Sequence, residues 1–532
     1  MKHRIIKAVP FIWMFFGILW DIWYYITRGK IMLDSDVSAG MVLSDVLNSE
    51  HSLTGLSTNW LYSSELRFLH MQWFFRLGLL LFPNNWHMAR AVASSIALCL
   101  MAFAVWLVFH AIERNEWGIW AAAMTVFPGG GWYFWQTIYG TQHMPYIMIS
   151  FYSFALILLS TRDGKKTANR IFVLIAVLLA FGAGLNGIKQ LMVFYAPLLL
   201  SVLFVVALKA MILGDGCIQD KRLFKERVWK VFIMACIVST VAFAGYIVNS
   251  RILSKIYSFK QYSNSEIDYQ SFLEMLRMYL WSFGFIDGKK LMSPTGIASM
   301  CGVLFGMIVF FSAIRLLWRF KELDEGVQML TVMSVTSILF CCFIYSYVKS
   351  HGAIQYYQPV IPFGYCLVVM EIFTEHFRIK HSSFAAINMA MLILLVTSAG
   401  TVHNEQNEPF HKYRARPTLG PIVDMLVEKG YTQGVSLYWT SVVVRELSDG
   451  KIEMWSLDDT DPTQFEGTVQ KKSHLEAGPT GRYFYIFDYG KGEDYEWYDE
   501  ETNAGLAYVE AHPYPTALQP IYYDDTFIVY GN

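Results

Sequence analysis

Apolar segments long enough to cross a bilayer recur through residues 1–402, and they restrict the possible folds more than any other feature. A transmembrane helix needs about 20 apolar residues, because lipid offers its backbone no water to bind. Charged residues make up only 16% of the chain, against about 25% in soluble domains. We therefore predict a mainly α polytopic membrane protein with about 11 transmembrane helices. The predicted spans are residues 8–26, 88–111, 117–134, 143–161, 171–187, 191–211, 231–249, 296–315, 327–346, 357–374 and 384–402.

Basic residues between the spans predict the orientation, since Lys and Arg accumulate on the cytoplasmic side. These basic residues lie in the segments that the alternation of spans places on one side of the membrane. They are Lys2, Arg4, Lys7, the runs 162–170 and 214–230, Arg315, Arg319, Lys321, Arg378 and Lys380. We expect a multi-pass protein of the cell membrane with a cytoplasmic N-terminus. An outer loop at 27–87, a second outer loop at 250–294 and the C-terminal part would then be extracytoplasmic.

The chain changes character after residue 402. Residues 403–532 hold 22 acidic against 10 basic side chains, which argues against a nucleic-acid partner. Residues 417–430 predict a helix that a glycine ends, and 441–450 predict a second helix. The predicted strands are 434–440, 451–457, 482–490 and 526–532. We predict a transmembrane domain at 1–402 and a small extracytoplasmic α/β domain at 403–532.

Residues 34–76 form the longest polar interruption in the first 300 residues, directly after the first span. Asp34 and Asp36 precede an amphipathic segment. Glu65 directly precedes a second one at 66–82, which contains Arg67 and which we expect to lie in the membrane interface. A carboxylate beside low-dielectric surroundings can act as a general base toward an attacking hydroxyl. The alternative is that Asp36 is simply the N-cap of a helix.

This order of elements resembles the GT-C membrane glycosyltransferases, which include protein O-mannosyltransferases and the aminoarabinose and galacturonic-acid transferases that modify lipid A. The strings DSDVSAGMVLSDVL (34–47) and NWLYSSELRFLHMQ (59–72) carry the resemblance, and the architecture extends it over the membrane half. The family's Asp-Glu-Ala type of motif is not intact, because Val37 and Ser38 follow Asp36.

The resemblance implies an inverting transfer of a hexosyl or pentosyl group. The donor would be a polyprenyl-phosphate-linked sugar, and the acceptor a glycan or glycolipid hydroxyl on the outer face. Asp36 is the favoured base, with Asp34 and Glu65 as orienting or alternative acids. The partners are thus membrane lipid, the lipid-linked sugar and the acceptor.

A donor phosphate calls for outward-facing cations. Lys189 and Gln190 lie at a predicted outer turn between two spans, and Arg67 is a second candidate ligand. The alternative for Lys189 is a lysine that extends from a helix end toward water. His143 starts a predicted helix on the outer side and is a further binding candidate, against the alternative of an ordinary interfacial histidine.

Residues 349–363, KSHGAIQYYQPVIPF, resemble the Arg-Tyr helix start with spaced prolines in these transferases. Gln355 stands in the place of the arginine and Tyr356 follows it, so both are candidate substrate-binding residues. A proline-kinked span with interfacial tyrosines is the alternative. No phosphate-binding glycine loop and no metal-ligand spacing of cysteines supports a cofactor or a metal site.

Two other classes of function compete with the enzyme. A transporter or flippase of lipid-linked saccharides usually carries charges in mid-membrane and repeated halves. Here the polar groups gather at the predicted outer surface. A non-catalytic membrane scaffold with an extracellular binding domain is the other alternative, and it leaves the polar residues of 34–76 without a role.

Overall fold

The computed structural model describes residues 2–63, 66–162, 166–213, 226–259, 271–347, 353–375, 380–407, 417–458, 464–488, 519–524 and 527–531. These residues belong to two compact units. Unit 1 contains residues 1–21, 97–252 and 263–407, and unit 2 contains residues 22–96, 253–262 and 408–532.

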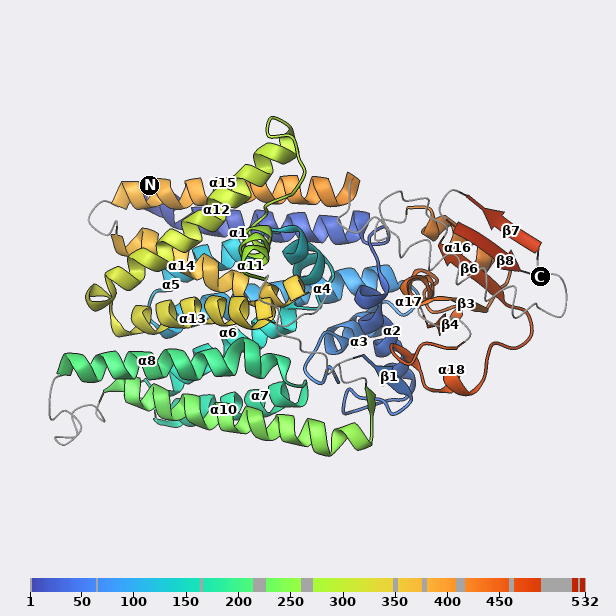
Figure 1. The fold of residues 1–532 in the computed structure, drawn as a ribbon, viewed down its shortest axis with the longest axis horizontal. Helices are drawn as coiled ribbons and strands as arrows, with labels where there is room; N and C mark the ends of the chain where they lie inside the picture. The colour runs from blue at the N-terminus through green and yellow to red at the C-terminus, as the bar shows by residue number, and fades with distance from the viewer. Residues whose placement is uncertain are drawn as a thin grey trace. The chain divides into compact units, whose positions relative to one another are not determined.

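Unit 1 is built from long apolar helices (Figure 1). Its elements are parts of α1 (Lys2–Arg28) and α4 (Trp86–Ala111), then α5 (Asn115–Thr125), η1 (Tyr133–Tyr139), α6 (Met144–Ser160), α7 (Lys166–Leu185), η2 (Leu191–Tyr195), α8 (Ala196–Leu213), α10 (Arg227–Arg251), α11 (Ser271–Ser282), α12 (Pro294–Trp318), η4 (Phe320–Glu322), α13 (Glu325–Tyr347), η5 (Ala353–Val360), α14 (Ile361–Glu375) and α15 (Lys380–Asn407).

Among the described residues, 8 helices are long and apolar enough to cross a membrane, or up to 9 if the pair η1 and α6, bent by 74°, forms one span. This supports the prediction of a mainly helical, polytopic chain. Two of the predicted spans contain shorter helices: α5 has 11 residues and α14 has 15. The count of about 11 spans therefore stays a prediction.

Glycines let two of these helices touch. A Cβ atom added to Gly184 on α7 would lie 2.0 Å from the carbonyl oxygen of Ala242 on α10. A Cβ atom on Gly245 of α10 would lie 2.4 Å from the carbonyl oxygen of Phe181. Small residues at such contacts are typical of helices packed in a membrane, where close backbone approach supplies the attraction.

Unit 2 combines helices with two small sheets (Figure 1). Its elements are the remaining parts of α1 and α4, then α2 (Ser35–Ser49), β1 (Trp60–Tyr62), α3 (Gln72–Leu81), η3 (Leu253–Lys255), β2 (Ser258–Phe259), α16 (Leu419–Glu428), β3 (Gln433–Leu437), α17 (Tyr438–Leu447), β4 (Glu453–Leu457), β5 (Gln470–Lys471), α18 (Ser473–Glu476), β6 (Phe484–Asp488), β7 (Gln519–Tyr523) and β8 (Phe527–Gly531).

The larger sheet has the strand order β4-β3-β6-β8-β7. Strand β3 pairs in parallel with β4 and β6, while β8 runs antiparallel to β6 and β7. Helix α17 is the crossover between β3 and β4, as parallel neighbours require. One face of the sheet buries Val435, Leu437, Trp455, Leu457, Tyr485 and Phe487.

The elements predicted in the tail are present. Helix α16 lies within 417–430, and Gly430 follows it with a φ of +77°, a conformation that glycine adopts without strain. Strands β3, β4, β6 and β8 overlap their predicted segments, whereas strand β7 was not predicted. Helix α17 begins three residues earlier than predicted, so the prediction of strand for residues 438–440 is wrong.

The smaller sheet joins three distant segments of the chain. Strand β1 pairs in parallel with β2 and antiparallel with β5, so the loop after the first span, the 253–262 segment and the tail share one unit. The predicted division at residue 402 and the predicted outer-face location stay predictions. The predicted helix at 66–82 is shorter in the structure, because α3 begins only at Gln72.

Candidate functional site

Helix α2 begins at Ser35, a few residues after α1 ends at Arg28, and Asp34 is its N-cap. Asp34 has extended backbone angles, and its carboxylate accepts a hydrogen bond from the backbone N–H of Val37 at 2.7 Å. Only 2% of Asp34 is exposed. An aspartate in this place satisfies a helix N–H that has no partner within the helix. The interpretation of Asp36 as the N-cap is therefore wrong: the capping residue is Asp34.

Asp36 lies in the first turn of α2 and stays partly exposed, between the buried Ser35 and Val37. Its Oδ1 accepts a hydrogen bond from the phenol of Tyr438 at 2.8 Å. The N-terminal turn of a helix favours a negative charge, because the free N–H groups point toward it. Asp36 is thus a carboxylate held at a helix start without being used to cap it.

Tyr438 opens α17 directly after strand β3. Burial raises the pKa of Tyr438 well above its usual value, and the charge and the hydrogen bond of Asp36 raise it further. The charge of Arg67 partly offsets this rise and that of Asp34 adds to it. The phenol therefore stays protonated and acts as a donor. Asp34, Asp36, Arg67 and Tyr438 form one electrostatic group within unit 2, which we call the Asp36 cluster.

Arg67 belongs to a constrained turn. Its φ is +53°, a left-handed conformation that side chains other than glycine rarely adopt. The buried amide of Gln72 donates to the carbonyl oxygen of Arg67 and, at 3.3 Å, to that of Phe68. Such backbone conformations persist only where surrounding contacts hold them, and they gather at functional sites. Glu65, the third predicted acid, lies outside the described residues.

A buried ion pair lies next to Asp36, and it was not predicted from the sequence. Arg90 on α4 binds Glu446 on α17 through two contacts of 2.5 and 2.6 Å, and it also donates to the carbonyl oxygen of Val37 at 3.1 Å. The two side chains are only 4% and 3% exposed. One signal was available, because a charged residue within an apolar segment rarely lacks a partner. Its partner lies 356 residues away.

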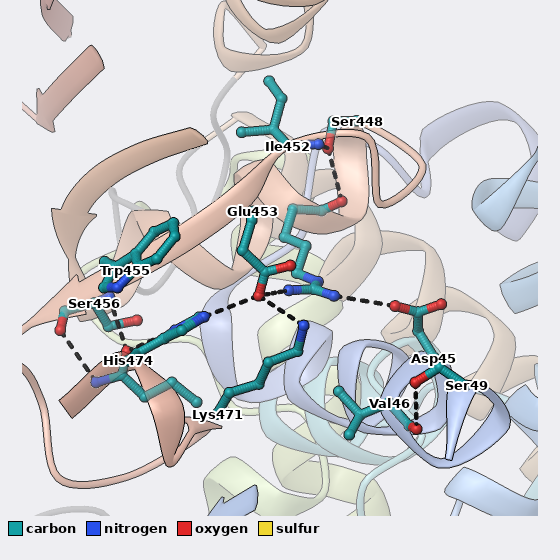
Figure 2. A network of polar contacts seen from close by, with 12 residues as sticks. Asp45, Val46, Ser49, Ser448, Ile452, Glu453, Trp455, Ser456, Lys471 and His474 are labelled. Carbon is teal, nitrogen blue, oxygen red and sulfur yellow. Dashed lines mark hydrogen bonds and ion pairs between the residues drawn. The ribbon is translucent and has the colours of Figure 1, made fainter. Parts of the chain in front are cut away.

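A second polar network attaches the tail to α2, as Figure 2 shows. Arg445 on α17 binds Asp45 at 3.0 Å and also pairs with Glu453 on β4. Glu453 further accepts contacts from Lys471 at 3.0 Å and from His474 at 2.9 Å. The predicted site residues did not include any member of this group, which we call the Glu453 network.

Burial, a hydrogen bond and neighbouring charges shift the pKa values of two residues in the Glu453 network. Burial raises the pKa of Glu453, but the hydrogen bond from His474 and the charges of Arg445 and Lys471 outweigh burial and lower it below its usual range. Burial lowers the pKa of His474, and its contact with Glu453 only partly offsets that effect. The ring of His474 also stacks on Trp455, with centroids 4.5 Å apart. Because both pKa values are lowered, we expect a neutral His474 next to an ionised Glu453.

Three predicted substrate-binding residues meet around Tyr146 in unit 1. The ring of His143 lies 5.6 Å from the Tyr146 ring, and Lys189 Nζ lies 5.1 Å from the centroid of the same ring. The Gln190 amide donates to the carbonyl oxygen of Tyr146 at 3.3 Å and to the Ser150 hydroxyl at 2.9 Å. His143 and Gln190 are buried, whereas Lys189 is half-buried. The structure thus brings a cation, an imidazole and an amide together.

The remaining predictions concern η5 and metals. Gln355 and Tyr356 lie on η5, but their side chains lie outside the described part of the chain, so their binding role stays a prediction. Within the described ranges, His, Cys, Asp and Glu side chains form no group of three or more that could hold a metal ion.

No family model matches this sequence, and no curated protein matches it. Several solved structures are similar to this chain in fold. ArnT from Cupriavidus metallidurans in the apo state is similar with a TM-score of 0.53 and 11% identity, over 98% of each chain. ArnT bound to undecaprenyl phosphate is similar with a TM-score of 0.51, also at 11% identity, over 100% of this chain and 98% of that one.

The oligosaccharyltransferase of Archaeoglobus fulgidus, in its complex with Zn and sulfate, is similar with a TM-score of 0.50 and 10% identity. The match covers 91% of this chain and 68% of that one. Both proteins are GT-C membrane glycosyltransferases. At this level of identity the likeness concerns the fold. The resemblance inferred from residues 34–76 is confirmed at that level: this chain shares its fold with these two GT-C membrane glycosyltransferases.

Proposed function

We propose that this chain is a membrane glycosyltransferase. It moves a hexosyl or pentosyl group from a polyprenyl-phosphate-linked donor to an acceptor hydroxyl on the outer face, with inversion at the sugar. The observation that carries the proposal is the state of Asp36. In a chain with the GT-C fold, this carboxylate directly follows the first span, stays partly exposed and is oriented by Tyr438 rather than used as a helix cap.

Asp36 acts as the general base. It takes the proton of the acceptor hydroxyl while that oxygen forms a bond to the anomeric carbon of the donor sugar. The bond between the anomeric carbon and the phosphate oxygen breaks, and the electron pair leaves with the lipid phosphate. Because a lipid phosphate is a good leaving group, the protein mainly supplies positioning, a base and cations. Asp34 has a supporting role, since its carboxylate caps α2.

The lipid phosphate requires positive charge and hydrogen-bond donors. Lys189, Gln190 and His143 offer both around Tyr146 in unit 1. Arg67 supplies a second cation in unit 2. Lys189 in unit 1 and Arg67 in unit 2 are separate candidate ligands of the donor phosphate, and Gln355 and Tyr356 are further candidate contacts. Undecaprenyl phosphate bound to ArnT supports a polyprenyl phosphate as the carrier.

The tail is proposed to bind or cover the acceptor, a glycan or glycolipid. In this proposal residues 27–87, 250–294 and 403–532 face the outside, and the N-terminus is cytoplasmic. The transmembrane domain ends at residue 402, and residues 403–532 form an extracytoplasmic α/β domain. Their five-stranded sheet with α16 and α17 supports the α/β character.

The test compares two single changes at the start of α2. Cells that lack the protein receive the wild type, Asp36→Asn or Asp34→Ser, and mass spectrometry of envelope glycolipids and glycoproteins records the added sugar. We expect Asp36→Asn to abolish detectable transfer in cells at unchanged protein level, because an amide cannot take the proton, and to leave only a small residual rate in the purified protein. Asp34→Ser should retain transfer, since a serine oxygen can still cap the helix.

Full transfer by Asp36→Asn would show that this residue is not the base. Two further measurements distinguish the competing classes of function. Purified protein in vesicles that moves undecaprenyl-phosphate-linked sugar across the bilayer without forming a glycosidic bond would identify a flippase. A scaffold would tolerate both substitutions and would bind a partner through its tail.

A further inference from the structure

We infer that Tyr438 is a positioning residue for Asp36, and that the C-terminal part of the chain thereby orients the base of the proposed reaction. The inference depends on the proposed function and deepens it. Tyr438 lies 402 residues from Asp36 in the sequence, and its hydroxyl donates to Asp36 Oδ1 at 2.8 Å.

Two contacts tie Tyr438 to the start of α2. Besides the phenol contact to Asp36, the hydroxyl of Ser35 donates to the backbone carbonyl of Tyr438. The hydroxyl of Ser441, one turn into α17, donates to the same carbonyl at 3.2 Å. Backbone and side chain of Tyr438 are therefore both engaged at residues 35 and 36, which limits the directions that the phenol can take.

The rest of α17 holds this arrangement in place. Glu446 binds Arg90, which also donates to the carbonyl oxygen of Val37, the residue after Asp36. Arg445 binds Asp45 near the other end of α2 at 3.0 Å. Helix α17 is thus attached to α2 directly through Tyr438 and Arg445, and indirectly through the Arg90 that Glu446 binds. A catalytic group held from several sides loses little freedom when the reaction begins.

The contact also distinguishes the two oxygens of the carboxylate. Tyr438 engages Oδ1, so we assign Oδ2 as the oxygen that takes the proton of the acceptor. Because the Tyr438 phenol is partly buried beside negative charge, it keeps its own proton and remains a donor. Rotation of the carboxylate would break this hydrogen bond, and the phenol therefore fixes the plane in which Oδ2 meets the acceptor.

The experiment measures transfer by the full-length protein in detergent or nanodiscs, with undecaprenyl-phosphate-linked sugar as donor and an envelope extract as acceptor. Tyr438→Phe keeps the ring and removes only the donor. We expect kcat to fall by about 10- to 100-fold, a share of the 10²- to 10⁴-fold that a positioned base contributes. KM for the donor should stay within about twofold of the wild type, because the change affects a transition-state interaction.

Tyr431→Phe is the matched control. It makes the same change in the tail, where the Tyr431 ring packs on Phe484 with centroids 5.5 Å apart. Its kcat should stay at the wild-type level. Rates are normalised to folded protein by size-exclusion chromatography, so a loss of fold is not counted as a loss of rate. Unchanged kcat in Tyr438→Phe would overturn the inference.

A double-mutant cycle separates positioning from general packing. If Tyr438 acts through Asp36, adding Tyr438→Phe to Asp36→Asn produces no further loss of the residual rate. If it only packs α17, the two losses multiply, and that result contradicts the inference. A fully active Asp36→Asn would contradict the proposed function itself. An inactive Asp36→Asn together with a fully active Tyr438→Phe would contradict only the positioning role.

Discussion

At the scale of single residues, two aspartates that are two positions apart have different tasks. Asp34 is buried and caps α2, whereas Asp36 is partly exposed and accepts from Tyr438. A helix start has several free N–H groups, and the residue with extended backbone angles before the first turn is the one whose side chain reaches them. The geometry of the turn therefore separates a structural acid from a candidate base.

His474 illustrates how burial makes a single residue sensitive to pH. Because its pKa is lowered in the fold, the unfolded chain binds a proton below about pH 6.5 that the folded protein does not bind as readily. The free energy of unfolding therefore falls as the pH drops below that value. Glu453, whose pKa is also lowered, contributes stability above its ordinary value of 4.5, and this contribution is lost at more acid pH.

We expect the thermal midpoint of the protein to fall between pH 7 and pH 5.5, the range in which an unperturbed histidine titrates. His474→Gln should flatten this dependence, since it removes the group that titrates. His51→Asn is the control, because His51 is exposed and its φ of 50° suits asparagine. The measurement is thermal unfolding in detergent over a pH series, and an equal slope for the wild type and His474→Gln would contradict this account.

At the scale of elements, helix α17 organises the candidate site. It follows β3, crosses to β4 and binds α2 through Tyr438 and Arg445, while its Glu446 binds Arg90 on α4. A helix that joins two parallel strands packs on the sheet with one face, which leaves the opposite face for another element. In this chain α2 takes that place, so the proposed base Asp36 lies against the tail.

The buried pair of Arg90 and Glu446 provides a test at this scale. Removing one partner leaves a charge without compensation in the interior, so Arg90→Met or Glu446→Leu alone should lower the free energy of unfolding by about 3 to 5 kcal/mol. The double variant should recover part of the loss, because two apolar side chains can replace a buried pair. Lys7→Met, in an exposed pair with Glu116, should change stability by only about 0 to 1 kcal/mol.

Denaturant unfolding in detergent, together with the yield of folded protein, measures these differences. A double variant as unstable as the worse single variant would show that the pair is not an isolated charge interaction. Single variants that remain as stable as the wild type would show that water or another group compensates the remaining charge.

At the scale of the whole molecule, the distribution of charge predicts the sidedness. Lys and Arg between the predicted spans predict a cytoplasmic N-terminus and an extracytoplasmic location for residues 403–532. Alkaline phosphatase fused after Asn532 should be active, because it folds only outside the cytoplasm, and green fluorescent protein at the same place should be dark. Phosphatase inserted into the basic segment 162–170 should be inactive. The reverse pattern would contradict the orientation and with it the outer-face reaction.

Much of the architecture follows from local patterns. Apolar length identifies the membrane-spanning helices, and the alternation and turn residues of the tail identify α16, β3, α17 and β4. These features depend on residues that are near in sequence, so composition and periodicity reveal them. The same patterns did not indicate the breaks at η5 and α5, which interrupt the helices of two predicted spans.

The sequence by itself determined that this chain is a polytopic membrane protein with a polar, acid-containing loop after its first span. Only the tertiary structure decided that Asp34 is the cap, that Tyr438 donates to Asp36 and that Arg90 pairs with Glu446. The physical reason is separation along the chain. Partners 356 and 402 residues apart share no periodicity that a sequence can display, and folding alone brings them within hydrogen-bond distance.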